Sequence, residues 1–105
     1  MKISNETRFF GMLGFAMRAG KISTGADIIC RELPKGEIFL TIVSTHASEP
    51  TKKRMRNKCE FYQTECVEVD VLPDELSQKL GKLNTTVCIA VKDEAFKREI
   101  LKCLE

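Results

Sequence analysis

The first segment of the chain carries apolar residues at helical spacing. Phe9, Leu13, Ala16 and Met17 recur every three or four positions, which predicts an amphipathic helix from Asn5 to Ala19. Four further segments have a similar period, and three of them begin at a residue suited to capping a helix. They are Thr24 to Leu33; a segment capped by Ser48 that includes Met55, Cys59 and Tyr62; Asp74 to Leu80; and a segment capped by Asp93 that includes Phe96, Ile100, Leu101 and Leu104.

Between these helices lie segments with the patterns of strands. Ile38 to Val43 and Val87 to Val91 are nearly continuous apolar runs, as expected for strands buried on both faces. Cys66 to Val71 alternates valines with cysteine and acidic residues, which predicts a half-exposed strand, and Lys21 to Ser23 is a short fourth strand. Because helices and strands alternate almost strictly, the pattern predicts an α/β fold, a three-layer α/β/α sandwich with a mixed, mostly four-stranded sheet. The length of 105 residues fits one domain, residues 1–105.

The charges are distributed unevenly along a chain of otherwise ordinary composition. Hydrophobic residues make up 43% and charged residues 30%, which excludes a disordered chain. The net charge is only +2, but Thr51 to Lys58 (TKKRMRNK) holds five cations and no anion, whereas Glu60 to Leu80 holds six carboxylates and one lysine. This asymmetry predicts an electropositive face that attracts phosphate. A set of solvated surface helices would give the same pattern, so charge alone leaves both interpretations open.

The chain offers little material for enzymatic or metal chemistry. Its five cysteines show no C-x-x-C spacing and His46 is its one histidine, so no zinc site, disulfide framework or nucleophile–base pair is indicated. The acidic pairs Asp74-Glu75 and Asp93-Glu94 fall at predicted helix starts, where carboxylates stabilise the helix. No signal peptide is recognisable, and no apolar run approaches the ~18 residues of a membrane span. We therefore expect a cytoplasmic, non-enzymatic protein without cofactor or metal and with no membrane partner.

The turn between the first two predicted helices is the strongest candidate for a binding site. It reads RAGKISTGAD, and the second helix is predicted to begin at Thr24. A helix N-terminus offers free N–H groups to a phosphate, and the glycine beside it would let a nucleic-acid backbone approach closely. Arg18, Lys21 and Arg31 could surround that ligand with cations. The alternative is a plain capped helix, in which Thr24 and Asp27 form a variant capping box.

Three stretches of the chain carry a family resemblance: GMLGFAMRAGKISTG, FLTIVSTHASEPTKKRMRNKCEFY and LGKLNTTVCIAVKDEAF. In this order and spacing they resemble the kink-turn-binding ribosomal protein superfamily, whose members include archaeal ribosomal protein L-seven-A-e and eukaryotic L-thirty-e. The resemblance runs nearly end to end and is greatest to the small bacterial members. It implies an α/β/α sandwich that binds RNA at one edge, as a ribosomal or ribonucleoprotein component acting in translation. The implied partner is structured RNA, such as ribosomal RNA or the ribosome.

The resemblance also implies which residues face the RNA. In such proteins the N-terminus of the second helix enters the sheared G·A pairs of a kink-turn, and an apolar loop before the last strand packs on flipped-out nucleotides. Carried over by position, the first surface is Lys21, Thr24, Gly25, Ala26, Asp27, Ile28 and Arg31. The loop is Lys82, Leu83, Asn84 and Thr85. Internal loops of RNA are commonly recognised in this way, by shape, splayed bases and backbone contacts.

The second helix departs from the G-x-N-E-x-x-K signature of the superfamily. Relatives use Asn and Glu to bind guanine edges and Lys to bind phosphate, whereas the matching stretch here is GADIICR. Arg31 keeps the cation, Asp27 lacks the amide donor and adds an anion, and Ile28 cannot hydrogen-bond guanine. Two lost base contacts at ~1–3 kcal/mol each would weaken kink-turn binding by about 10²-fold or more. We therefore expect general binding of structured RNA rather than specific kink-turn recognition.

Two questions about the interface stay open at the level of sequence. A protein-interaction adaptor on the same fold is the alternative function, because Asp27 and Ile28 suit a protein partner better than they suit guanine. The basic segment Thr51 to Lys58 either extends the RNA-binding surface or is simply solvated. Thr45-His46 stands where relatives often carry an acidic pair, which makes that rim less negative and favours nucleic acid.

Overall fold

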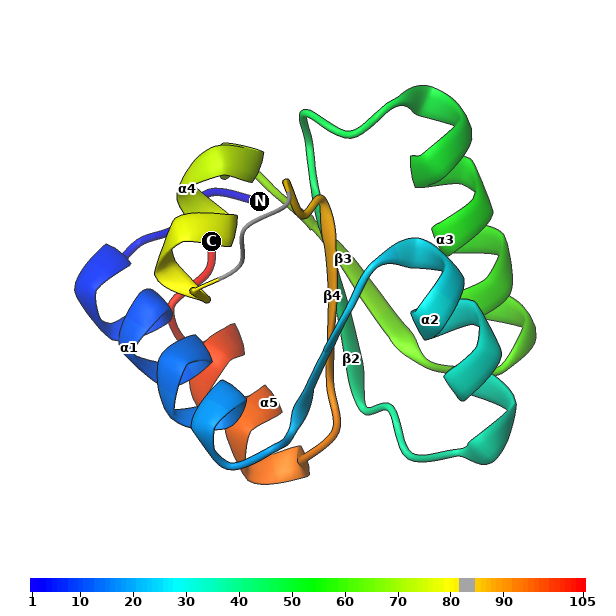
Figure 1. Ribbon diagram of the computed structural model, residues 1–105, viewed down its shortest axis with the longest axis horizontal. Coiled ribbons are helices and arrows are strands. Elements are labelled where there is room, and N and C mark those ends of the chain that lie inside the picture. The colour runs from blue at the N-terminus through cyan, green and yellow to red at the C-terminus, as the bar shows by residue number, and fades with distance from the viewer. Residues whose placement is uncertain (82–84) are drawn as a thin grey trace.

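A four-stranded sheet separates two layers of helices in the computed structural model, which describes residues 1–81 and 85–105 (Figure 1). Helices α1, α4 and α5 cover one face of the sheet, and α2 and α3 cover the other. The elements in chain order are α1 (Glu6–Arg18), β1 (Ile22–Thr24), α2 (Ala26–Glu32), the 3₁₀ turn η1 (Leu33–Lys35), β2 (Leu40–Ser44), α3 (Glu49–Phe61), β3 (Glu65–Val69), α4 (Pro73–Lys79), β4 (Cys88–Val91) and α5 (Glu94–Leu101). The predicted three-layer α/β/α sandwich with a mixed sheet is confirmed.

The strand order is β1-β4-β2-β3, with β2 and β3 parallel and the other two pairs antiparallel. All five residues of β2 are buried, as the apolar run predicted. Because β1 and β2 are both antiparallel to β4, they run in the same direction, and the chain leaves both strands at one end of the sheet. Helices α2 and α3 begin at that end, and β4 starts there (Figure 1). This topology gathers the candidate binding segments at one edge of the molecule.

Two apolar clusters, one on each face of the sheet, hold the layers together. On one face, α1 contributes Phe9 and Leu13, which pack with Ile42 of β2 and Ile100 of α5. On the other, Met55 of α3 packs with residues of α2 and β4. Three cysteines are buried as free thiols in these clusters and act there as small apolar residues. They are Cys59, Cys88 and Cys103. Burial raises the pKa of the Cys88 thiol to about 11, so it stays protonated at neutral pH.

Local capping explains where most helices begin. Ser48 Oγ accepts a hydrogen bond from the Thr51 N–H at the start of α3, and Asp93 Oδ1 accepts one from the Phe96 N–H at the start of α5. Both caps were predicted from the sequence and are confirmed.

The longest helices, α1 and α3, have 13 residues each, so no helix in the described part of the chain can span a bilayer.

The predicted N-cap of the second helix is wrong. Thr24 is the last residue of β1, where it pairs with Ile89 of β4, and Gly25 precedes α2 without any side-chain cap. The pairing with β4 holds the chain extended one residue further than the local pattern suggests. The variant capping box of Thr24 and Asp27 is therefore absent, and the side chain of Asp27 contacts a different helix.

Candidate nucleic-acid interface

The turn from β1 into α2 is built on Gly25. Its backbone has φ +96° and ψ 136°, a conformation that is nearly restricted to glycine. Its N–H donates a hydrogen bond to the carbonyl of Cys88 at 3.1 Å, and its carbonyl accepts one from the Ile29 N–H at 3.0 Å. The first of these bonds ties the start of α2 to the start of β4. Two segments that lie some sixty residues apart in the chain, the turn and the segment before β4, are thereby brought to the same place.

The segment before β4 is also held from the other side of the sheet. Thr85 Oγ1 lies 3.4 Å from Asp74 Oδ1, and the Thr86 N–H donates to Ser77 Oγ at 2.6 Å, so α4 anchors residues 85–86. The three remaining residues of the predicted loop, Lys82, Leu83 and Asn84, lie outside the described residues. The described end of the loop therefore sits between α4 and the turn into α2.

The residues predicted on α2 fall into exposed and inward-facing positions. Asp27, Ile28 and Arg31 are exposed, and Ile28 keeps 41% of its surface open to solvent, which is high for a large apolar side chain. Ala26 packs against the core under α2. The exposed positions Asp27, Ile28 and Arg31 can therefore meet a partner, whereas Ala26 mainly supports the helix.

Lys21 lies apart from the other predicted residues. It precedes β1, and its carbonyl accepts a hydrogen bond from the Lys92 N–H beyond the far end of β4. The three residues of β1 separate Lys21 from Gly25, and these four steps along the chain span about 13 Å at the rise of a strand. Arg18 is further back, at the end of α1, with its guanidinium 4.9 Å from the Phe15 ring centre. The cations expected around the turn are therefore spread along the length of β1.

Arg54 of α3 is a charged neighbour of the turn that sequence reasoning did not single out. Its Nη1 lies 2.7 Å from Asp27 Oδ1, and this hydrogen bond raises the pKa of the Arg54 guanidinium above its ordinary value. The two residues are 27 positions apart, so no local pattern links them. Because the guanidinium balances the Asp27 carboxylate, the anion that replaces the amide of the relatives does not stand alone.

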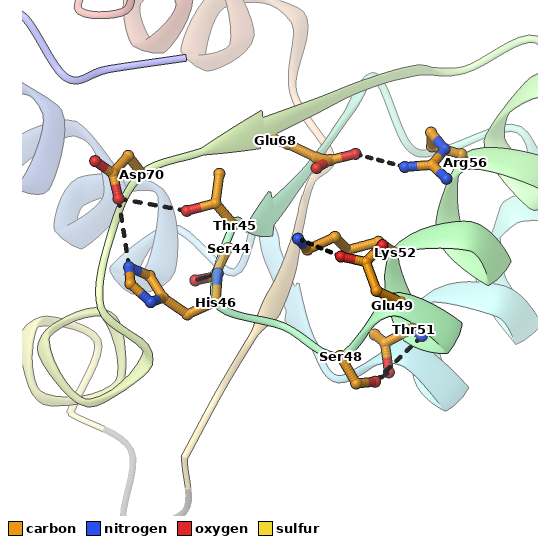
Figure 2. Close-up of polar contacts among 10 residues, drawn as sticks. All are labelled: Ser44, Thr45, His46, Ser48, Glu49, Thr51, Lys52, Arg56, Glu68 and Asp70. Carbon is orange, nitrogen blue, oxygen red and sulfur yellow. Dashed lines mark hydrogen bonds and ion pairs between the residues drawn. The ribbon is translucent and has the colours of Figure 1, made fainter.

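A second polar group lies at the carboxyl ends of β2 and β3 (Figure 2). Thr45 Oγ1 and His46 Nε2 each lie 3.3 Å from Asp70 Oδ1. The Ser44 N–H donates to the carbonyl of Val87 at 2.8 Å, which places this rim beside the segment that precedes β4. The rim is thus continuous with the turn into α2, and its one carboxylate faces a histidine and a hydroxyl.

The protein also has a surface cavity of about 390 Å³ between α1 and α4, on the other side of the sheet from α2 and α3. Its lining includes the carboxylates of Glu6 and Glu75 and the ammonium of Lys79, a poor setting for a phosphate. No group of three metal-ligating side chains occurs among residues 1–81 and 85–105. The turn into α2 and its surroundings remain the best candidate interface.

Comparisons with known proteins show which fold the protein has and which proteins are its relatives. No family model matches the chain. The 15.5kD RNA binding protein of Giardia lamblia superposes with a TM-score of 0.73 over 93% of this chain and 82% of that one, at 14% identity. The protein therefore has the same fold as the Giardia lamblia protein.

Relatives of higher identity refine this placement. A protein of unknown function from Bacillus halodurans superposes with a TM-score of 0.83 and is 31% identical, over 91% of this chain and 95% of that one. Two proteins named RNA-binding protein YlxQ match as well: that of Enterococcus faecium is 28% identical over 100% of this chain and 99% of its own length, and that of Bacillus subtilis 29% over 92% and 95%. The chain belongs to the same family as the Bacillus halodurans protein and is a homologue of the YlxQ proteins.

Proposed function

We propose that the protein binds structured RNA through the turn from β1 into α2 and the segment before β4. The hydrogen bond from Gly25 to Cys88 carries this proposal, because it unites the two segments that the resemblance implies as the RNA-binding surface. The homologues named RNA-binding protein YlxQ support the same function. Ribosomal RNA is the proposed natural partner, and the protein acts as an accessory or component of the translation machinery.

The proposed recognition relies on shape and backbone contacts rather than on guanine edges. Ile28 offers an apolar surface on which an unstacked base can pack, and Arg31 offers a cation to a phosphate. Thr85, which stands next to the loop residues Lys82, Leu83 and Asn84, extends the surface from the other side. Asp27 is engaged with Arg54 at 2.7 Å, so its carboxylate is not proposed to contact a guanine.

The test is equilibrium binding of the purified protein to a kink-turn RNA and to ribosomal RNA fragments across a range of salt concentrations. Replacing Arg31 by Ala should flatten the dependence of log Kd on log salt by about 0.7–0.9, the contribution of one phosphate contact. Lys21→Ala is the matched control, since Lys21 lies about 13 Å from the turn, at the far end of β1, and a smaller effect is expected. Absence of binding to every RNA at low salt would refute the function and favour a protein partner for Ile28.

Kink-turn specificity has a separate test. The double variant Asp27→Asn with Ile28→Glu restores the two guanine readers of the relatives. It should tighten binding to a kink-turn RNA by about 10²-fold, at ~1–3 kcal/mol per base contact, and leave binding to a duplex unchanged. An unchanged kink-turn affinity would show that the start of α2 does not face the G·A pairs.

A further inference from the structure

The facing sides of α2 and α3 carry three cations next to the proposed RNA-binding turn. The two helices run in the same direction, side by side on one face of the sheet (Figure 1), and the ion pair between Asp27 and Arg54 joins the start of α2 to the middle of α3. Arg31 lies one turn after Asp27 on α2, and Lys58 lies one turn after Arg54 on α3. Residues four apart share one side of a helix, so Arg31 and Lys58 lie on the same sides of α2 and α3 as the residues of the bridge.

Two of these three cations have no neighbouring carboxylate, unlike several other surface cations of the protein. Arg31 and Lys58 have no ion-pair partner among the described residues, and both are exposed. Arg54 has only Asp27, whose side chain is 84% exposed. We name Arg31, Arg54 and Lys58 the basic seam. Three cations that share a single exposed carboxylate attract a polyanion at low and physiological salt.

Helix α3 sorts its charges by side, which distinguishes the seam from a generally basic surface. Arg56 lies two positions from Arg54 and therefore on the opposite side of the helix, where it binds Glu68 of β3 at 2.8 Å (Figure 2). Glu49 pairs with Lys52 at 3.3 Å at the start of the helix. Arg56 and Lys52 are thus each paired with a carboxylate, whereas Lys58, on the side that faces α2, has no ion-pair partner among the described residues.

We propose that the basic seam binds the phosphate backbone of an RNA helix that continues from the structure held at the turn into α2. This inference depends on the proposed function, and it adds Arg54 and Lys58 of α3 to the surface. The seam starts at the Asp27–Arg54 bridge, two residues from Gly25, so one RNA can occupy the turn and the seam together. Its aligned cations suit the regular spacing of phosphates along a nucleic-acid backbone.

The experiment compares Arg54→Gln and Lys58→Gln with the control Arg56→Gln in the intact protein. Each variant removes one positive charge from α3, but only the first two change the seam. The RNA probe is a ribosomal RNA fragment that the unmodified protein binds, with a duplex next to its internal loop. Lys58→Gln should lower the salt slope by about 0.7–0.9, which corresponds to about tenfold weaker binding at 50 mM salt and almost none near 1 M. Arg54→Gln should weaken binding at least as much, because it also leaves Asp27 uncompensated.

The outcomes separate the seam from the proposed function. If the unmodified protein binds RNA while Lys58→Gln and Arg54→Gln bind as it does, the function stands and the seam is refuted. Equal losses in all three variants would indicate a response to net charge alone and would also overturn the seam. If poly-glutamate competes with the RNA at equal charge concentration, the surface accepts acidic protein segments and the RNA assignment fails. Circular dichroism of each variant confirms that it is folded before binding is compared.

Discussion

Gly25 and Gly11 make a matched pair for testing the backbone of the candidate interface. A Cβ built at either position meets no atom within 4 Å beyond the adjacent backbone, so replacement by Ala introduces no steric clash with other parts of the protein. They differ in backbone conformation. Gly25 has φ +96°, whereas Gly11 lies within the regular helix α1. The substitution therefore isolates the conformational cost of a side chain at the turn.

The expected effects have opposite signs. An alanine forced into the conformation of Gly25 costs about 1–3 kcal/mol, of which ~0.4–1 kcal/mol is offset by the lower entropy of the unfolded chain. The net loss is about 1–2 kcal/mol. Gly11→Ala should stabilise the protein by ~1 kcal/mol, the difference in helix propensity. For a domain of this size about 1 kcal/mol moves Tm by ~4 °C, so Gly25→Ala should melt ~4–8 °C below the unmodified protein and Gly11→Ala ~4 °C above it.

Thermal unfolding followed by far-ultraviolet circular dichroism measures both shifts. A Gly25→Ala variant that melts at or above the temperature of the unmodified protein would refute the positive φ at the turn. A destabilised Gly11→Ala variant would contradict the assignment of that residue to a solvent-exposed helix position. RNA binding by the two folded variants gives a second measurement. Gly25→Ala should weaken RNA binding because it displaces the turn, whereas Gly11→Ala should leave RNA binding unchanged.

Two further predictions concern the core and the surface. Ile42→Ala in the central strand, where the side chain is fully buried, should lose about 2–5 kcal/mol in urea unfolding, and a loss well below this range would contradict the packing of β2. At Glu99, a hydrogen bond from Arg8 lowers the carboxyl pKa below its ordinary value of 4.5. A lowered pKa in the folded state stabilises the protein above the unfolded pKa, and this contribution is lost as the pH falls through the folded pKa. Glu99→Gln should therefore reduce the fall in stability below about pH 4.5, and an unchanged acid profile would argue against this pair.

The sequence predicted the fold well where local signals determine it. The caps at Ser48 and Asp93 bind nearby backbone N–H groups, and their chemistry is visible within four residues. The buried strands follow from apolar runs, and the alternation of helices with strands leads to the sandwich. The prediction that Thr24 caps the second helix was wrong because the conformation of Thr24 depends on β4, a strand near the other end of the chain that pairs with it. Local chemistry favoured a helix start there, and long-range strand pairing prevailed.

The candidate site was predictable in outline, but its electrostatics were not. Position along the motif located the turn at Gly25, yet the contact between Asp27 and Arg54 joins two helices through a strand and two loops. No spacing rule connects residues 27 positions apart. Lys21 shows the converse effect, since it is near Gly25 in sequence but is separated from it by the length of β1. An extended strand separates residues that are close in sequence, whereas packing between helices brings together residues that are far apart in sequence.

The Asp27–Arg54 pair changes what the departure from the superfamily signature means. Read from sequence, Asp27 removes a base contact and also repels phosphate. In the structure the guanidinium of Arg54 lies 2.7 Å from that carboxylate, so the pair is close to neutral and the repulsion largely disappears. The base contact is still missing, because a carboxylate occupied by arginine offers no donor to guanine. Under the proposed function, the turn therefore combines a nearly neutral charge with the absence of base-reading groups, and this combination would favour recognition of RNA backbone and shape over recognition of a particular sequence.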